Sequence, residues 1–204
     1  MGGWPPATAI RAPASGVPVS LAAPSGTFTE QNLVTGGTAT AQGSVSSLAG
    51  CQPEFIAVSP DSVAVTATTP SAFLLGGQGA DDLVATSGNN LLDAGTGPTL
   101  MIGGSGSDAF DIDAKGATTW DAVANFHAGD RLVLWGATQG VCQLSWTETQ
   151  TQAVLTVTGG GVTSAGVGLV GVSAAQAHQL VVSGGTAGGL NYLMLTQSLA
   201  RARG

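Results

Sequence analysis

The sequence predicts an all-β protein whose middle is a stack of short, repeated strands. First, hydrophobic residues make up 43% of the 204 residues, which is too many for a disordered chain. Second, only 8% of the residues are charged and 32 are glycine, and threonine, valine and serine are frequent, which favours strands and turns. Third, a nine-residue pattern recurs without a gap over 76–111. Repetition at a short, fixed period is typical of chains that coil and stack on themselves.

The part of the chain before the repeats is expected to be irregular. Residues 1–26 are rich in Pro, Ala, Ser and Gly, which predicts a flexible N-terminal arm. Residues 27–57 carry alternating runs such as TFTEQNLVT, which predict N-terminal strands. Prolines interrupt any apolar region near the N-terminus, so we expect no classical signal peptide. No run of 18 apolar residues occurs, and we expect no insertion into a membrane.

The repeated units are GGQGADDLV, ATSGNNLLD, AGTGPTLMI and GGSGSDAFD. The fourth position holds Gly79, Gly88, Gly97 and Gly106, the sixth holds Asp81, Asn90, Thr99 and Asp108, and the eighth holds Leu83, Leu92, Met101 and Phe110. Counting back in the same frame places Leu74 and Val65 at the eighth position as well. The same chemistry therefore returns every nine residues at three positions.

Each unit has the composition of a tight turn followed by a short strand. Glycine permits the positive φ that we expect in such turns. The apolar eighth position is predicted to point inward, so that stacked units bury a continuous stripe. The stripe explains the glycines and Leu83, but it leaves Asp81 without an explanation.

The acidic residues suggest an answer. Eight of the twelve acids lie within 81–130, where Lys115 is the only base. Such a segment repels nucleic acid and anionic membranes, and it either forms a solvated acidic face or attracts a divalent cation. Stacked turns present carboxylates and carbonyl oxygens to a shared gap, and calcium takes six to eight such ligands.

Two units match the pattern G-G-x-G-x-D-x-U-x completely, and the chain resembles the RTX family of hemolysin-type calcium-binding repeats, for which that pattern is known. The resemblance implies a short parallel β-roll over 58–117, in which turns two units apart stack. It would pair 76–81 with 94–99 and 85–90 with 103–108, each pair holding one aspartate where the family normally has two. The implied Ca²⁺ site residues are Gly76, Gly77, Gly79, Asp81, Asn90, Gly103, Gly104, Gly106 and Asp108. With half of the acids missing, between zero and two ions are expected.

Residues 118–204 are predicted to form an antiparallel C-terminal cap. VCQLSWT and QAVLTVT read as a hairpin, GVTSAGVGLVGV as an extended segment, SAAQAHQL as a short helix with a capping box, and LNYLML as a final strand. WDAVANFHAGDRLVLWG is similar to the segment that closes many RTX rolls, with Asp121, Phe126, Gly129, Asp130 and Leu132 in the familiar arrangement. The tail resembles the C-terminal regions of substrates of the type I secretion machinery in Gram-negative bacteria, although the final LARARG departs from them.

These features predict a secreted, non-catalytic, calcium-stabilised structural or adhesive protein that forms a homo-oligomer or filament at the cell surface. One alternative is the secretion and folding module of a larger secreted hydrolase. Another is a carbohydrate-binding module, in which Trp120, Trp135 and Trp146 would bind a polysaccharide rather than pack in the core. After export, Cys51 and Cys142 would be able to form a disulfide.

Enzymatic chemistry is not indicated by the sequence. DIDAKG begins like an EF-hand loop, but its twelfth position is Ala122 and supplies no carboxylate. No G-x-S-x-G motif occurs, and His127 and His178 are the only histidines. The chain is therefore expected not to be an enzyme.

Overall fold

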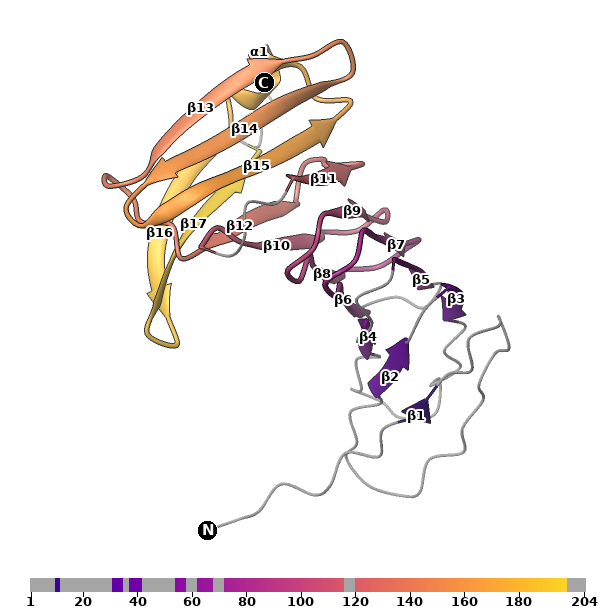
Figure 1. The fold of residues 1–204 in the computed structure, drawn as a ribbon. Helices are drawn as coiled ribbons and strands as arrows, with labels where there is room; N and C mark the ends of the chain where they lie inside the picture. Colours follow the sequence, from indigo (N-terminus) through magenta and orange to yellow (C-terminus); the bar gives the residue numbers. More distant parts are fainter. Residues whose placement is uncertain are drawn as a thin grey trace.

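The computed structural model describes residues 10–11, 31–34, 37–41, 54–57, 62–67, 72–115 and 120–197. Most of the predicted arm 1–26 and much of 27–57, including Cys51, lie outside these residues. The described chain is all-β, with strands in one nine-stranded and one eight-stranded sheet and one short helix, α1. Figure 1 shows the coils and, beyond them, a C-terminal pair of sheets. None of the described helices is long and apolar enough to span a membrane.

The middle of the chain is a parallel solenoid in which successive strands alternate between the two sheets. Sheet A contains β1 (Ile10–Arg11), β2 (Gln31–Val34), β4 (Glu54–Ala57), β6 (Phe73–Leu75), β8 (Leu91–Asp93), β10 (Ala109–Asp113) and β12 (Arg131–Trp135). Sheet B contains β3 (Gly37–Ala41), β5 (Val63–Ala67), β7 (Asp81–Ala85), β9 (Thr99–Ile102) and β11 (Trp120–Ala124). Neighbouring strands of these two series run parallel. The predicted coil of two nonapeptides is therefore confirmed, and parallel coils continue as far as β12.

The register of the coils follows the repeat. Leu83 pairs with Met101, and Leu74 pairs with Leu92. The eighth-position side chains are completely buried, as the sequence predicts: Leu74, Leu83, Leu92, Met101 and Phe110. The final coil is longer, because Phe110 pairs with Leu132 and Met101 pairs with Val123. The four extra residues therefore fall between Phe110 and Val123.

The expected reason for the turn glycines is wrong at most positions. Among the repeat glycines, Gly88 and Gly95 have positive φ, whereas Gly76, Gly79, Gly103 and Gly106 do not. The constraint is instead the close approach of stacked backbones. A Cβ on Gly97 would overlap the carbonyl oxygen of Gly79, and one on Gly106 would overlap that of Gly88. Gly97 and Gly106 are therefore required as glycine because the preceding turn of the stack lies directly against them.

The C-terminal part extends both sheets with antiparallel strands. Sheet B gains β15 (Val162–Val170), β14 (Gln152–Gly159) and β13 (Gln143–Glu148), while sheet A gains β17 (Leu190–Thr196) and β16 (Val181–Ala187). The predicted hairpin, extended segment and final strand are present, whereas β16 was not predicted from the sequence. Helix α1 (Ala174–Ala177) has the predicted capping box between Ser173 and Gln176. Buried leucines join the two sheets: Leu155, Leu169, Leu193 and Leu195.

We expect Gly106→Ala to lower the free energy of unfolding by about 1–3 kcal/mol, the usual cost of forcing extra volume into a packed site. The new methyl group would overlap the backbone of Gly88, which has no flexible end to move aside. Ser105→Ala changes an exposed residue of the same turn and serves as the control. Urea unfolding measures both variants, and equal stability would contradict the proposed backbone contact.

Candidate functional site

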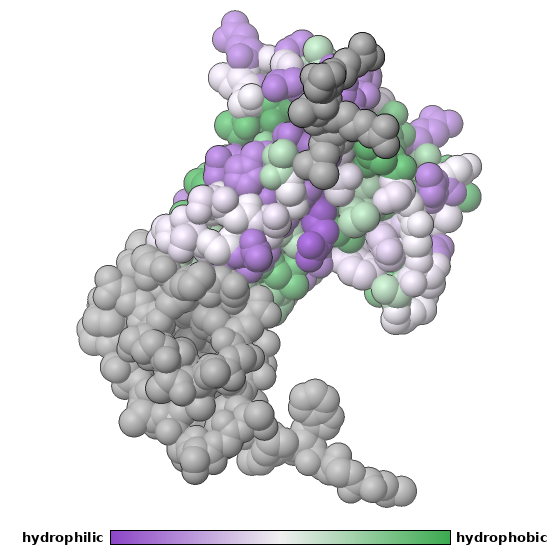
Figure 2. Space-filling model, turned by 180° about the vertical axis from the view of Figure 1, so that it is seen from behind, coloured by the Kyte–Doolittle hydropathy of each residue, from purple (hydrophilic) through white to green (hydrophobic). Residues whose placement is uncertain are grey.

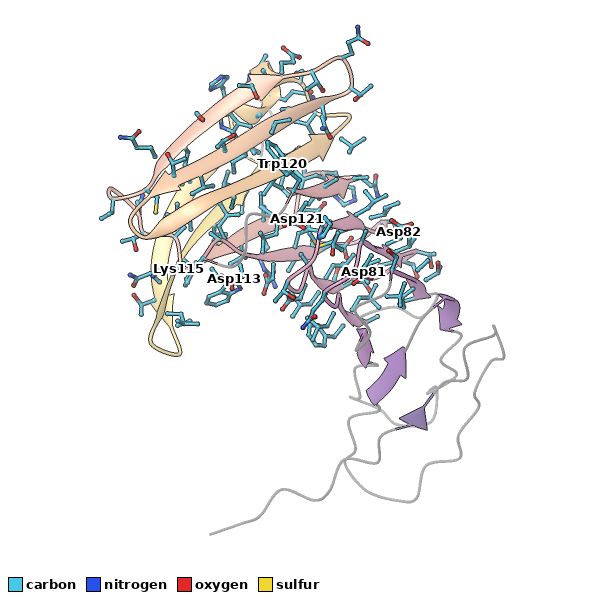
Figure 3. The ribbon with its side chains drawn as sticks, in the orientation of Figure 1. Asp81, Asp82, Asp113, Lys115, Trp120 and Asp121 are labelled. Atoms are coloured by element: carbon cyan, nitrogen blue, oxygen red, sulfur yellow. The ribbon has the colours of Figure 1, made fainter. Side chains whose placement is uncertain are left out.

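The sixth-position residues form two buried columns along the solenoid. One column contains Val63, Asp81, Thr99 and Asp121, and the other contains Ala72, Asn90, Asp108 and Asp130. Every polar member of these columns is at most 4% exposed. Figure 3 shows Asp81 and Asp121 at different coils of the first column. The columns bring together the predicted residues Asn90 and Asp108, and they add Asp121 and Asp130.

Each column is held by hydrogen bonds between a side chain and the backbone of the preceding coil. Asp81 accepts the N–H of Val63 at 2.9 Å, and Asn90 accepts that of Ala72 at 2.9 Å. The other three bonds have the same form: Asn90 N–H to Asp108 at 2.8 Å, Thr99 N–H to Asp121 at 3.0 Å, and Asp108 N–H to Asp130 at 2.8 Å. The buried aspartates therefore join successive coils as hydrogen-bond acceptors.

Asp121 and Asp130 continue the columns across the longer coil. Their bonds span 22 residues, whereas the preceding ones span 18. The sequence resemblance includes both residues in the closing segment, but neither was assigned to the metal site. The available signal was their spacing, since they lie nine residues apart, like Asp81 and Asn90.

The first predicted gap, between turns 76–81 and 94–99, has its polar groups already paired. The second oxygen of Asp81 accepts the N–H of Gly77 at 2.6 Å. The Thr99 hydroxyl donates to the carbonyls of Ala94 at 2.8 Å and Gly97 at 3.3 Å. The carbonyl of Gly77 accepts from Thr96 and Gly97 of the stacked turn. Each oxygen of Asp81 already accepts a hydrogen bond, so this gap needs a cation less than a gap with an unpaired carboxylate oxygen.

In the second gap, between turns 85–90 and 103–108, an amide lies among oxygens. The Asn90 Nδ2 group is 3.1 Å from the carbonyls of Ser87 and Gly88 and 2.7 Å from Asp108 Oδ1. Carbonyl and carboxylate oxygens are also the ligands that calcium prefers. The amide of Asn90 therefore supplies positive partial charge where a cation would otherwise be needed.

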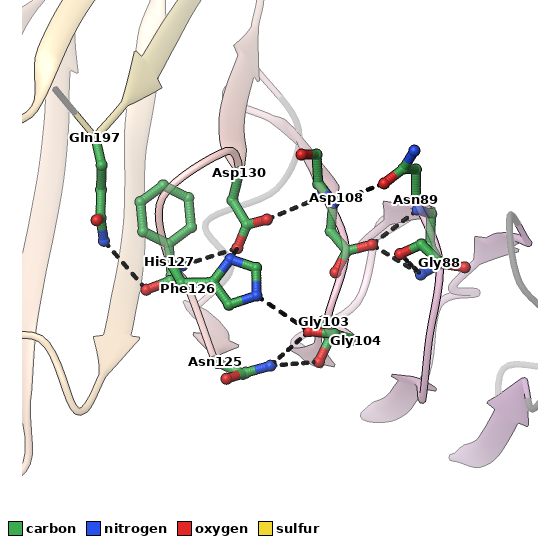
Figure 4. Close-up of polar contacts among 12 residues, drawn as sticks. Gly88, Asn89, Gly103, Gly104, Asp108, Asn125, Phe126, His127, Asp130 and Gln197 are labelled. Carbon is green, nitrogen blue, oxygen red and sulfur yellow. Dashed lines mark hydrogen bonds and ion pairs between the residues drawn. The ribbon is translucent and has the colours of Figure 1, made fainter. Parts of the chain in front are cut away.

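The closing turn 125–130 covers the other side of Asp108, as Figure 4 shows. Asn125 donates to the carbonyls of Gly103 at 2.9 Å and Gly104 at 2.7 Å. The His127 ring lies between Gly104 O, 3.2 Å from Nε2, and Asp130 Oδ2, 3.2 Å from Nδ1. Burial raises the pKa of Asp130, and the charge of Asp108 also raises it, whereas hydrogen bonds from the backbone of Asp108 and His127 lower it. Two carboxylates thus lie in adjacent turns of this column.

Asp108 has the one buried carboxylate oxygen without a partner among the described residues. Its side chain is fully buried, and Oδ2 has no hydrogen bond. This oxygen lies beside Gly103, since a Cβ built there would be 2.7 Å from it. Asp108 Oδ1 accepts two hydrogen bonds from Asn90, but a buried carboxylate oxygen without any partner is costly, so Oδ2 favours a cation beside it. Within the described ranges, however, no three or more His, Cys, Asp or Glu side chains cluster as a metal site, and backbone carbonyls would have to supply the remaining ligands.

The three tryptophans of the predicted polysaccharide site do not all lie in one sheet. Trp120 lies on β11 and Trp146 on β13, both in sheet B, whereas Trp135 lies on β12 in sheet A. Trp135 packs against Tyr192 with ring centroids 5.3 Å apart and donates to Asp111. Cys142 is a free thiol that accepts the N–H of Thr138 at 3.2 Å. Cys51 lies outside the described residues, so the disulfide stays a prediction.

No model of a known protein family matches the chain, and no curated protein matches it either. The relation to nonapeptide-repeat proteins therefore depends on the repeat pattern and on the parallel coils.

We expect Asn90→Ala to lower the free energy of unfolding by about 2–4 kcal/mol, because several buried groups lose their partners at once. These groups are the N–H of Ala72, two turn carbonyls and Asp108. Asn89→Ala is the matched control, since exposed Asn89 accepts a single bond, from the N–H of Ser107. Chemical denaturation tests the pair, and comparable losses in both variants would argue against the column.

A second prediction concerns Asp93 and Asp111, which pair across β8 and β10. Burial raises the pKa of both carboxyls from 3.8. A carboxyl with a raised pKa in the folded state stabilises the protein most below its unfolded pKa, and this contribution is lost as the pH rises through the folded pKa. Stability should therefore increase as the pH is lowered from 7 toward the raised pKa values.

Replacing both residues by asparagine should raise stability at pH 7 and flatten this pH dependence. The exposed Asp82, replaced by asparagine, is the control. Melting temperatures between pH 4 and 8 decide the matter; an unaltered pH profile in the double variant would refute the assignment.

Proposed function

We propose that the chain is a non-catalytic structural β-roll module that acts outside the cell and is stabilised by calcium. The observation that carries this proposal is the fully buried Asp108, whose Oδ2 has no hydrogen-bond partner. Export through the type I secretion machinery and assembly into a homo-oligomer or filament remain parts of the proposal, supported by the sequence resemblance and the low charge.

The donor set around Asp108 supports calcium more than other common cations. The candidate donors are oxygens: Asp108 Oδ2, which lies beside Gly103, the backbone carbonyls of turn 103–108, and Asp130, which accepts the N–H of Asp108. Calcium accepts mixed carboxylate and carbonyl ligands in flexible geometries. It would also supply a positive charge next to the unpaired oxygen of Asp108. Asn125 and His127 donate to, or lie against, the same carbonyls in the ion-free arrangement, so binding would compete with these contacts. We therefore expect an affinity in the range typical of extracellular modules, about 10⁻⁴–10⁻³ M.

The hydrogen bonds of the columns support a structural role. The five bonds link buried sixth-position side chains to the backbone of the neighbouring coil. As backbone acceptors, the buried aspartates hold neighbouring coils together. A stack of this kind provides a rigid, extended body, which suits a scaffold outside the cell.

The first test is the calcium dependence of stability. If the affinity is about 10⁻⁴–10⁻³ M, 10 mM calcium should stabilise the protein by about 1.4–2.7 kcal/mol relative to chelator. Asp108→Asn should abolish this difference, because it removes the charge and keeps the shape. Asp81→Asn should preserve it, since both oxygens of Asp81 already accept hydrogen bonds. Melting curves and calorimetric titration with calcium chloride provide the measurements, and an identical wild-type melt in calcium and chelator would refute the calcium proposal.

A gain-of-function variant gives an independent test. Asn90→Asp places a carboxylate opposite Ser87 O, Gly88 O and Asp108, where the amide now donates. In chelator this variant should be less stable than wild type, because like charges meet in a buried gap. Calcium should restore its stability and produce a larger melting shift than in wild type.

Asn89→Asp adds the same charge at the exposed neighbouring position and is the matched control. It should melt like wild type under both conditions. If Asn90→Asp is destabilised equally with and without calcium, the second gap does not bind the ion.

A further inference from the structure

The two sheets end at the C-terminal side in strands that are paired on one edge only. β13 is the last strand of sheet B, and β16 is the last strand of sheet A. In the part of the chain that the structure describes, no strand pairs with the outer edge of either one. An edge strand leaves alternate N–H and C=O groups without a ladder partner, and these groups can pair with another chain. The exposed edges therefore form a template for strand addition.

These two edges carry little of the charge and proline that usually protect edge strands, although α1 packs against β13 and β14. Lysine, inward-pointing charge and proline are the common means of preventing strand addition. β16, with the sequence VVSGGTA, contains none of them, and the only charged residue of β13 is Glu148. Glu148 accepts the N–H of Ala174 at 3.3 Å, so it is held at the start of α1. Figure 2 shows the β16–β17 hairpin, at the lower right, as mostly pale.

The core is incompletely covered at this end. Leu144 and Trp146 of β13, together with Leu180 and Val182, pack against the core but stay partly exposed. On the interior strands, by contrast, Leu155 and Leu195 are completely buried. Val181 on β16 is 50% exposed. A partner that continued the sheets would complete the burial of these apolar groups.

We propose that a second copy of this chain binds here, with β16 of each copy adding to β13 of the other. A single peptide strand would extend only one sheet, whereas a second copy presents both edges. Beyond the coils, sheet B extends by three strands and sheet A by two. If sheet A of one copy continues into sheet B of the other, the shorter extension meets the longer one at both contacts. The two contacts are then identical and are related by a two-fold axis. The contact is isologous, which is the commonest arrangement in homodimers. This inference rests on the proposed structural function.

Sedimentation equilibrium over micromolar concentrations, in calcium, tests the association. Wild type should form dimers, and Val181→Lys should raise the dissociation constant at least about tenfold, because a lysine on an edge strand opposes the addition of another strand. Val170→Lys is the matched control: Val170 is also exposed, but its strand β15 is paired on both edges. It should dimerise like wild type. A wild-type protein that stays monomeric while its melting temperature depends on calcium would overturn this inference and leave the calcium proposal intact.

Thiol cross-linking tests which strands meet. In a background with Cys51→Ser and Cys142→Ser, the variants Ser145→Cys on β13 and Ser183→Cys on β16 are mixed with a short bifunctional maleimide. Cross-linked dimers should form in the mixture and be scarce when either variant is alone. Efficient cross-linking of the Ser183→Cys variant with itself would overturn the pairing of β16 with β13.

Discussion

The stacking of backbone directly on backbone at the turns is the constraint on which the rest of this structure depends. Gly97 lies against Gly79, and Gly106 lies against Gly88, closely enough to exclude a Cβ. Because of this contact, each coil contains two repeat units. The apolar eighth-position side chains of successive coils then lie next to one another in the core. The contact also fixes the sixth-position side chains at a height from which their oxygens reach the N–H of the preceding coil. The hydrophobic stripe and the polar columns are therefore two consequences of a single backbone arrangement.

Much of this fold could be predicted from the sequence because the repeat encodes it locally. The period gives the coil, and Leu74 to Phe110 identify the core without any knowledge of long-range contacts. The reason for the glycines was missed, since crowding between coils depends on how far apart the coils lie, which the sequence does not state. β16 was missed because VVSGGTA carries glycines and a serine that predict a turn as well as a strand.

The candidate site was predicted less well than the fold. The sequence pattern identifies Asp81 and Asp108 as equivalent, yet their surroundings differ. Asp81 has two backbone N–H donors, whereas Asp108 has the backbone and side chain of Asn90 on one oxygen and nothing on the other. The difference lies within each turn: the N–H of Gly77 donates to the second oxygen of Asp81, whereas Asp108 Oδ2 accepts no hydrogen bond. Where the repeat pattern predicts an acid, Asn90 and Thr99 make hydrogen bonds within the stack instead.

The way in which the last coil is covered has a consequence for the order of folding. Strands in the coils pair with partners close in sequence, but Trp120 pairs with Gly166 and Arg131 pairs with Thr196. Gln197, immediately beyond β17, also donates to the carbonyl of Phe126 in the closing turn. Pairing between distant segments requires a larger loss of chain entropy and is slower than pairing between near ones. During synthesis, in which the N-terminal residues leave the ribosome first, the coils can therefore form early. The last coil, however, lacks its neighbouring strands until β15 and β17 have been made.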